Sequence, residues 1–244
     1  MRWITAIPVY NEANYVRDVL RQVRKTSPEI LVVNDGSTDG TAELLAHEPG
    51  LQVIAHPQNR GYGAALVSAF RYAVDRGYDV LVTMDCDGQH EPARIPVLLE
   101  AIHDADIVSG SRYLRDFRQN TPVPEERLRI NRQITAEIND RYGLNITDAF
   151  CGFKAYRTDA LAKLDVTEFG YGMPLQLWVQ TARLGLRVKE VGVPRVYLDL
   201  SRAFGGALDH AEQRLSYYRS VLNNAERHWA EKTAGPELCR ETCQ

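Results

Sequence analysis

The stretch Ile30-Leu-Val-Val-Asn34, with Asp35 and Gly36 directly after it, decides the fold. Four apolar residues in a row are typical of a strand in a parallel sheet that helices cover on both faces. An acidic residue and a glycine at its end predict a turn at the carboxyl end of the strand, where open α/β sheets bind their ligands. The stretch therefore predicts an α/β protein with a site at that edge of the sheet.

Strands and helices alternate on either side of this stretch. In the first half we expect strands at residues 3–8, 30–34, 51–55, 79–84 and 106–109, and helices at residues 14–25, 41–46, 62–76 and 95–102. In the less regular second half we expect helices at residues 125–142, 175–184 and 207–228, and short strands at residues 153–156, 187–191 and 195–198. The alternation predicts right-handed βαβ units and a mostly parallel central sheet flanked by helices.

The composition argues against several classes of protein. The chain of 244 residues has 29 Lys and Arg against 32 Asp and Glu, and a net charge of -3 does not suit a nucleic-acid-binding protein. It contains no run of about 18 apolar residues and no apolar leader, so we expect no transmembrane segment and no signal peptide. The four cysteines form no Cys-x-x-Cys pair, which suits reduced thiols in the cytoplasm.

The most informative motif follows the strand expected at residues 79–84. In Val82-Thr-Met-Asp85-Cys-Asp87-Gly-Gln89-His90, two carboxylates stand two residues apart, so in an extended segment they point the same way. Like charges this close need a cation or hydrogen-bond donors between them. Oxygen ligands select a hard ion such as Mg²⁺ or Mn²⁺, which commonly binds substrate phosphates as well. The motif predicts a metal site for a phosphorylated substrate.

Three other interpretations of these aspartates compete with the metal site. Both carboxylates could simply accept local backbone hydrogen bonds in a turn. A calcium loop of the EF-hand type beginning at Asp85 would need glutamate at its last position, where Pro96 stands. A phosphatase with its nucleophile in Asp-x-Asp-Gly-Thr would carry that motif after the first strand, whereas here it follows the fourth and Gln89 replaces the threonine.

Further polar segments lie at other ends of the predicted strands and helices. Pro8-Val-Tyr10-Asn11-Glu12 ends the first strand, and Asn59-Arg-Gly-Tyr-Gly63 leads into the third helix, so both can line one crevice. Asp35 can accept hydrogen bonds from a base or a ribose, although an ordinary turn with a helix cap also explains its segment. Neither the dinucleotide-binding fingerprint nor a Walker motif is present.

Together these segments resemble the family-2 inverting glycosyltransferases, in particular those that act on dolichyl or polyprenyl phosphate. The matching segments follow the order of the family: Pro8-Val-Tyr-Asn-Glu12, Val33-Asn-Asp-Gly-Ser-Thr-Asp39, Asn59-Arg-Gly-Tyr-Gly63, Met84-Asp-Cys-Asp-Gly-Gln89, Ser109-Gly-Ser-Arg112 and Thr147-Asp-Ala-Phe-Cys-Gly-Phe-Lys154. The resemblance implies the GT-A fold, a Rossmann-like α/β sandwich. It also implies that Asp87 and Gln89 ligate Mg²⁺ or Mn²⁺ at the diphosphate of a nucleotide-sugar.

The resemblance implies roles for further residues. The nucleoside would be held by a set around the first two strands, and the phosphates and the sugar by residues further along the chain. These nucleotide-sugar contacts are Pro8, Tyr10, Glu12, Val33, Asp35, Asp85, Cys86, Arg112, Arg132 and Arg202. For Arg132 and Arg202, a solvated arginine at the surface is the alternative.

The implied reaction moves a hexose from GDP-mannose or UDP-glucose to a polyprenyl or dolichyl phosphate with inversion, and Asp85, Asp87 and Arg112 would be catalytic. A phosphate acceptor is already anionic, whereas a hydroxyl on a soluble sugar or glycan would need a base. Asp148 is the candidate base, and a cap of a turn or helix is its alternative. A non-catalytic nucleotide-sugar binder is a third possibility, against which the intact acidic motif argues.

The same resemblance predicts the organisation of the chain. We expect a GT-A domain at residues 1–205, with a nucleotide-sugar and metal half at 1–112 and an acceptor half at 113–205. Residues 206–244 should form a helix and tail packed on the same domain. The stripe of Ile130, Ile134 and Ile138 is too narrow for a membrane anchor and predicts a core contact. We therefore expect a cytoplasmic protein with at most peripheral contact with a membrane.

Overall fold

The computed structural model describes residues 1–198 and 206–234, and its centre is a seven-stranded sheet with the order β3-β2-β1-β4-β6-β5-β7. The strands are β1 (Trp3–Val9), β2 (Ile30–Asn34), β3 (Gln52–Ala55), β4 (Val80–Thr83), β5 (Ile107–Ser111), β6 (Lys154–Arg157) and β7 (Val188–Gly192). Every neighbouring pair is parallel except the two pairs of β6, which runs antiparallel between β4 and β5. The expected α/β class with a mostly parallel sheet is confirmed.

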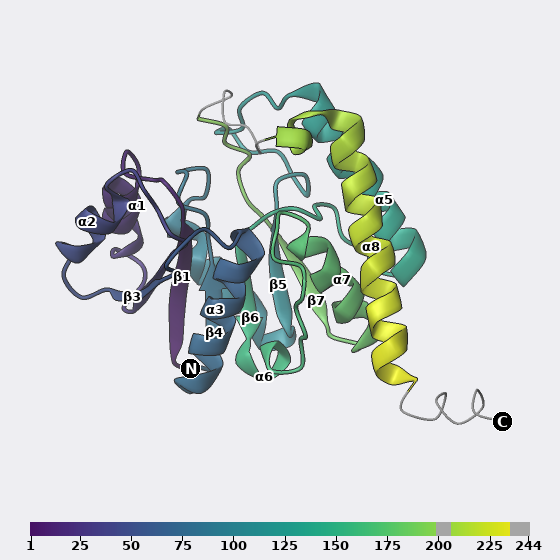
Figure 1. The fold of residues 1–244 in the computed structure, drawn as a ribbon, viewed down its shortest axis with the longest axis horizontal. Coiled ribbons are helices and arrows are strands. Elements are labelled where there is room, and N and C mark those ends of the chain that lie inside the picture. The colour runs from purple at the N-terminus through teal and green to yellow at the C-terminus, as the bar shows by residue number, and fades with distance from the viewer. Residues whose placement is uncertain (199–205, 235–244) are drawn as a thin grey trace.

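Helices cover both faces of this sheet (Figure 1). One face carries α1 (Val16–Val23), α2 (Thr41–Ala46) and α4 (Ile95–Ala101), whose apolar residues share a core. The other face carries α3 (Tyr62–Asp75), α5 (Glu125–Tyr142), α6 (Thr158–Leu161), α7 (Met173–Arg183) and α8 (Ala211–Thr233). In Figure 1, α5 and α8 lie side by side beyond α7, so the long C-terminal helix closes this face.

The strand β2 shows why its sequence is apolar without interruption. Leu31 and Val33 point into the core that includes α3, and Ile30 and Val32 point into the core that includes α1. Successive side chains of a strand alternate between its faces, and here both faces are covered. All five residues of β2 are buried, as the sequence predicts. The stripe of Ile130, Ile134 and Ile138 on α5 is also buried in a core.

Three elements differ from those expected. Residues 195–198 form no strand and run as a loop beside residues 120 and 121, which bind the backbone of Arg195. The short helix α6 was not expected, because it is a single turn without a periodic apolar pattern. The C-terminal helix begins at Ala211 and is preceded by a 3₁₀ turn at Gly206–Asp209.

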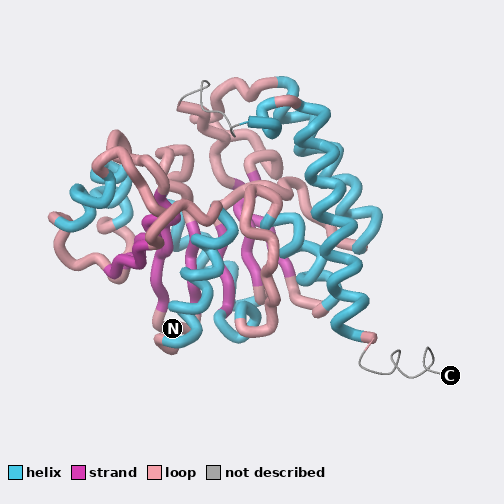
Figure 2. The backbone as a smooth tube through the Cα atoms, in the orientation of Figure 1, coloured by secondary structure: helices cyan, strands magenta, loops and turns pink. Residues whose placement is uncertain are grey.

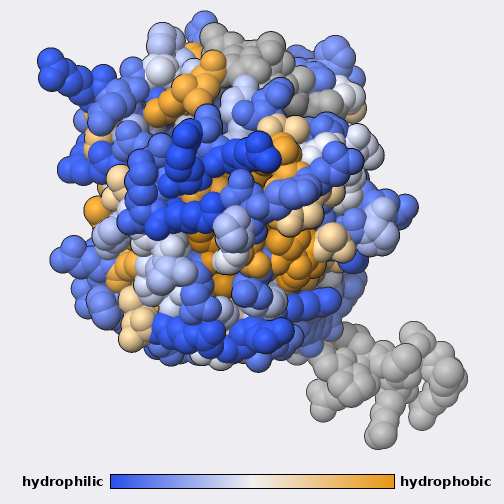
Figure 3. Space-filling view, turned by 90° about the vertical axis from the view of Figure 1, so that its left-hand side faces the viewer, coloured by the Kyte–Doolittle hydropathy of each residue, from blue (hydrophilic) through white to orange (hydrophobic). Residues whose placement is uncertain are grey.

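The strand β3 forms one edge of the sheet. Its residue Val53 is exposed, as are Gln52 and Ala55. The side of the molecule that carries α1 and α2 is mainly hydrophilic, with apolar patches between hydrophilic residues (Figure 3). Scattered apolar exposure of this kind is ordinary for a folded domain.

Candidate functional site

A cavity of about 630 Å³ lies at the carboxyl ends of the central strands. Loops gather at this edge of the sheet in Figure 2. Residues from the ends of β1, β2, β4 and β5 line it together with residues of α3, α5, α8 and the loop before α7. Open α/β sheets bind ligands at this edge, and the cavity is of a size that holds a small ligand.

The loops after β1 and β2 are joined by hydrogen bonds at one end of the cavity. The side-chain oxygen of Asn11 accepts from the backbone N–H of Thr38 at 2.8 Å, and the backbone N–H of Glu12 donates to the Thr41 hydroxyl at 3.0 Å. Asn11 has a φ of 55°, a left-handed conformation that asparagine tolerates better than most residues. These bonds fix Tyr10, an exposed ring, at the mouth of the cavity.

Asp35 is a buried carboxylate that organises the loop leading into α3. Its Oδ1 lies 2.5 Å from Nδ1 of His56 and accepts from the backbone N–H of Arg60 at 3.0 Å. Its Oδ2 accepts from the backbone N–H of Gly61 at 2.8 Å. Gly61 has a φ of 100°, and a Cβ there would lie 2.4 Å from the carbonyl oxygen of Phe169. A carboxylate has about four acceptor positions, so most of those of Asp35 are used by the protein itself.

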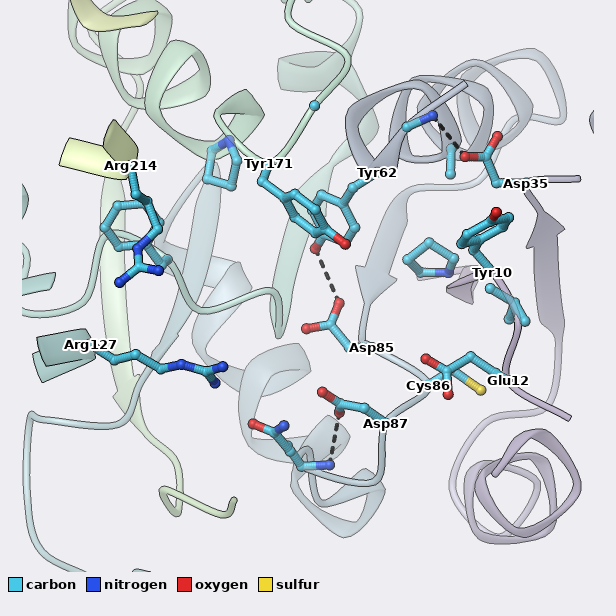
Figure 4. Close-up of a pocket in the computed structure, with 18 of the residues that line it drawn as sticks. Tyr10, Glu12, Asp35, Tyr62, Asp85, Cys86, Asp87, Arg127, Tyr171 and Arg214 are labelled. Atoms are coloured by element: carbon cyan, nitrogen blue, oxygen red, sulfur yellow. Dashed lines mark hydrogen bonds between the residues drawn. The ribbon is translucent and has the colours of Figure 1, made fainter. Parts of the chain in front are cut away.

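The loop after β4 brings Asp85, Cys86, Asp87 and Gln89 to the floor of the cavity. Oδ1 of Asp87 accepts from the backbone N–H of Gln89 at 3.0 Å, so the local turn considered for this motif is present as well. Oδ1 of Asp85 accepts from the hydroxyl of Tyr62 at 3.1 Å, and its backbone N–H donates to Nδ1 of His90 at 3.0 Å. Figure 4 shows both carboxylates between Tyr10 and Glu12 on one side and Arg127 and Arg214 on the other.

The donor atoms on this floor suit a divalent metal ion that takes only some of its ligands from the protein. Within residues 1–198 and 206–234, no group of three or more His, Cys, Asp or Glu side chains could hold an ion. The carboxylate of Asp87 and the amide of Gln89 are hard oxygen donors that line one cavity. Mg²⁺ is commonly bound by one or two carboxylates, with substrate phosphates and water as the other ligands. The residues therefore fit such an ion when a phosphorylated ligand supplies the missing oxygens.

Arg112 and Asp148 form a buried ion pair at the end of β5. Nε and Nη2 of Arg112 donate to the two carboxylate oxygens of Asp148 at 2.7 Å and 2.9 Å, and the amide of Asn131 donates at 2.8 Å. Burial alone would raise the pKa of Asp148, but the charge and hydrogen bonds of Arg112 hold that pKa well below its ordinary value. Asp148 is fully buried and does not line the cavity, whereas Arg112 does.

Two more arginines reach the cavity from helices. Arg127 comes from the first turn of α5 and Arg214 from the first turn of α8 (Figure 4). Nη1 of Arg214 donates to the carbonyl oxygen of Leu208 at 2.7 Å, and Nη2 pairs with the carboxylate of Glu126. We call Arg112, Arg127 and Arg214 the basic end of the cavity. The acidic end consists of Glu12, Asp35, Asp85 and Asp87 together with the ring of Tyr10.

The structure brings most of the sequence-predicted site residues to this cavity. Those that line it are Pro8, Tyr10, Glu12, Asp35, Asp85, Cys86, Asp87, Gln89 and Arg112. Val33 is buried in the core below α3, and Arg132 is exposed outside the cavity. Arg202 lies outside the described residues, as does the tail from residue 235 onward. The assigned roles stay predictions.

Several lining residues were not among the predicted site residues. Arg127, Arg214 and Tyr171 belong to elements that are far apart in the sequence, whereas Tyr62 stands in the segment 59–63 that was expected to line the crevice. Arg127 stands four residues before Asn131, which also lines the cavity, and positions i and i+4 share one face of a helix. Arg132 is turned by about 100° from Asn131 on the same helix and therefore points elsewhere.

Comparisons with known proteins match the chain to one family and to relatives within it. The model of the glycosyl transferase family 2 matches residues 5–165. The undecaprenyl-phosphate mannosyltransferase of Micrococcus luteus is 38% identical over 223 residues, which are 86% of this chain and 91% of that protein. The polyprenol monophosphomannose synthase of Mycolicibacterium smegmatis is 35% identical over 205 residues, 79% of this chain and 76% of that protein.

A solved structure with a similar fold is that of glucosyl-3-phosphoglycerate synthase from Mycobacterium tuberculosis in complex with phosphoglyceric acid. It has a TM-score of 0.72 at 20% sequence identity, covering 92% of this chain and 79% of that one. At this identity the similarity concerns the fold. The fold is that of the GT-A nucleotide-sugar transferases, as the motifs predicted.

Proposed function

The chain belongs to the glycosyl transferase family 2, and from this premise we propose that it transfers a hexose from a nucleotide-sugar, GDP-mannose or UDP-glucose, to a polyprenyl phosphate. One observation carries the proposal: a single cavity joins an acidic end, made by the ends of β1, β2 and β4, to a basic end with three arginines. A diphosphate donor and a phosphate acceptor need these two environments side by side. The names of the relatives agree with such an acceptor.

The donor would lie along the acidic end. The exposed ring of Tyr10 offers a face for the base, while Asp35 keeps the loop before α3 in place through His56 and Gly61. Asp85 would accept a hydrogen bond from a hydroxyl of the ribose or of the hexose. Asp87 and Gln89 would hold a Mg²⁺ or Mn²⁺ ion at the diphosphate. Such an ion, when bound, stabilises the negative charge that develops on the leaving nucleoside diphosphate.

The acceptor phosphate would lie at the basic end. Arg112 is oriented by its two hydrogen bonds to Asp148, and within the described part of the chain its Nη1 donates to no protein group. That group can therefore donate to a phosphate oxygen. Arg127 and Arg214 add positive charge on the same side (Figure 4). Inversion requires the acceptor oxygen to approach the anomeric carbon from the side opposite the leaving group, and the basic end would hold it there.

The state of Asp148 favours a phosphate acceptor over a hydroxyl acceptor. A general base needs a lone pair that faces the reacting proton and a pKa near the working pH. Asp148 is fully buried, accepts hydrogen bonds from Arg112 and Asn131, and has a lowered pKa. A phosphate monoester carries negative charge near neutral pH, with its second pKa near 6, and needs no base. We therefore propose that Asp148 positions Arg112.

A polyprenyl phosphate acceptor would also determine where in the cell the enzyme acts. No helix in the described ranges combines enough length and apolar character to cross a bilayer. A polyprenyl chain is embedded in a membrane, so the enzyme would meet its acceptor at the membrane surface. We propose peripheral contact on the cytoplasmic side.

The test is a transfer assay with the purified full-length chain. GDP-mannose or UDP-glucose is supplied with Mg²⁺ or Mn²⁺ and with either a polyprenyl phosphate or a soluble glycan, and the glycosylated product is measured. We expect product with the polyprenyl phosphate and none with the soluble glycan. Donor binding without product on either acceptor would favour a non-catalytic binder, and product on the soluble glycan would overturn the acceptor assignment.

A further inference from the structure

Tyr62 is a half-buried phenol in contact with the floor of the cavity. It is the first residue of α3, and its hydroxyl donates to Oδ1 of Asp85 at 3.1 Å. Burial and the nearby carboxylate of Asp85 raise the pKa of Tyr62 well above its ordinary value, so the hydroxyl keeps its proton and remains a donor. One oxygen of Asp85 is thus engaged by the protein.

The second oxygen of Asp85 is differently placed. Among the described residues, Oδ2 accepts no hydrogen bond, and Nε2 of His90 lies 3.8 Å from it. About a third of the side chain is exposed to the cavity. With Oδ1 held by Tyr62 and the backbone N–H donated to His90, the carboxylate presents Oδ2 as an oriented acceptor. An ionised carboxylate only accepts hydrogen bonds, so a hydroxyl group of a ligand in the cavity can donate to this oxygen.

Gly152 leaves room for this hydrogen bond. A Cβ at position 152 would lie 2.7 Å from Oδ2 and 2.8 Å from Oδ1 of Asp85, and 2.8 Å from the hydroxyl of Tyr62. Contacts this short are not seen for real Cβ atoms, so with any other residue the carboxylate of Asp85 or the phenol of Tyr62 would have to move. Thus three residues from separate parts of the chain meet at one point.

The ring of Tyr62 is held from its other side by Tyr171. The two rings stack with centroids 6.1 Å apart and planes 18° from parallel (Figure 4). Tyr171 lies in a loop whose carbonyl at Phe169 accepts from the backbone N–H of Gly63 at 2.7 Å. On α8, the hydroxyl of Tyr217 donates to the carboxylate of Glu168 at 2.8 Å and accepts from the N–H of Gly172 at 3.1 Å. The loop is therefore anchored on two helices.

We propose that Tyr62 is a positioning residue. It holds Asp85 in the orientation needed to accept a hydrogen bond from a hydroxyl of the nucleotide-sugar, and Tyr171 holds the ring of Tyr62. The proposal rests on the proposed function and adds to it the residue that sets donor recognition. The hydroxyl belongs either to the ribose or to the hexose, because both are present in the donor.

The test compares Tyr62→Phe with Tyr72→Phe, which removes a hydroxyl from the same helix, where it bonds Gln52 outside the cavity. Titration calorimetry measures the Kd of GDP and of GDP-mannose, or of the UDP pair, with Mn²⁺ present. We expect Tyr62→Phe to weaken the nucleotide-sugar about 10-fold, the size of one hydrogen bond to a charged group. Tyr72→Phe should bind like the wild type.

The two nucleotides distinguish the source of the hydroxyl. An equal loss for nucleotide and nucleotide-sugar assigns it to the ribose, and a loss for the nucleotide-sugar alone assigns it to the hexose. Equal affinities of Tyr62→Phe and Tyr72→Phe for both ligands would overturn the proposal. If the wild type itself binds no nucleotide-sugar, the proposed function fails instead, so the two failures are separable.

A second pair of variants tests the geometry. Gly152→Ala should cause a loss at least as large as that of Tyr62→Phe, because the new methyl group would displace the carboxylate of Asp85, the phenol of Tyr62 or both. The double variant should lose no more than Gly152→Ala alone, since groups that act through one hydrogen bond are not additive. Additive losses would show that Gly152 and Tyr62 act independently and would contradict the proposal. Thermal unfolding checks that each variant is folded.

Discussion

The acidic and basic ends of the cavity are built in different ways. The acidic end comes from short segments that directly follow β1, β2 and β4, and hydrogen bonds between neighbouring loops hold it. The basic end takes Arg112 from the end of β5, Arg127 from α5 and Arg214 from α8, which are far apart in the sequence. The comparison teaches that a binding surface made of strand ends leaves motifs in the sequence, whereas one made by helix packing leaves few.

The largest expected effect is the loss of activity when the acidic end can no longer bind a metal ion. Asp87→Ala removes a carboxylate from the acidic end, and we expect kcat/KM to fall by about 10³-fold, the size seen when a group that stabilises developing charge is lost. Treatment of the wild type with a chelator should have a similar effect, and added Mg²⁺ or Mn²⁺ should restore turnover. If added metal still raises the donor affinity of Asp87→Ala as much as it raises that of the wild type, the ligand assignment is refuted.

The next effect tests what holds the basic end together. Asp148→Asn leaves the charge of Arg112 buried without a full partner, so we expect the free energy of unfolding to fall by about 3–5 kcal/mol. Because the pKa of Asp148 is lowered in the folded state, its stabilising contribution is present above pH 4 and is lost as the pH falls below about 4. Urea unfolding at several pH values should therefore show a weaker acid dependence for Asp148→Asn than for the wild type.

Activity measurements on the same variant separate a base from a positioning residue. With a lipid phosphate acceptor, the residual activity of Asp148→Asn should not acquire a new pH profile between pH 6 and 9. A variant of wild-type stability whose activity is lost and is restored at high pH would instead identify Asp148 as a base. That outcome would also favour a hydroxyl acceptor.

A smaller effect distinguishes arginines on one helix. Arg127→Ala should raise the KM for polyprenyl phosphate by about 10-fold to 100-fold, because a hydrogen bond to a charged group contributes about 1.5–3 kcal/mol. Donor affinity should stay unchanged, since the change lies at the basic end. Arg132→Ala is the matched control on α5, where the side chain is exposed outside the cavity. Equal effects of the two variants on the KM for polyprenyl phosphate would contradict the proposal that the basic end binds the acceptor.

The smallest effect concerns the ring at the mouth of the acidic end. Tyr10→Ala should weaken nucleoside diphosphate binding by about 2-fold to 10-fold, the range expected for one partly exposed aromatic contact. Tyr10→Phe keeps the ring and should bind normally. Fluorescence or calorimetric titration with the nucleotide measures both. A loss in acceptor KM instead of nucleotide affinity would mean that the two ends are not separate.

The sequence predicted the acidic end well because its chemistry is local. Asp85 and Asp87 stand after an apolar strand, and the ends of parallel strands meet at one edge whatever the rest of the chain does. The basic end was predicted in part: Arg112 was found through its motif, but Arg127 and Arg214 were not. Their positions depend on the rotation and crossing of α5 and α8, which are set by side-chain packing rather than by a motif.

The same distinction applies to the fold. The strands with apolar runs were predicted to within a few residues, since burial on both faces dictates their composition. The segment 195–198 has a strand-like pattern but forms a loop, because Asn120 and Thr121 satisfy the backbone of Arg195 and no strand lies beside it among the described residues. The place of β6 in the sheet could not be predicted, because order in a sheet depends on partners that are distant in the sequence.

Since β6 lies between β4 and β5, the sheet cannot be completed until residues 154–157 have been synthesised. Translation runs from the N-terminus, so β4 emerges from the ribosome with one edge unpaired while more than half of the chain is still to come. An open strand edge can pair with other chains, and pairing over such a separation is slow. Nascent chains in this interval are expected to be clients of chaperones, and the GT-A domain to acquire protease resistance in one late step.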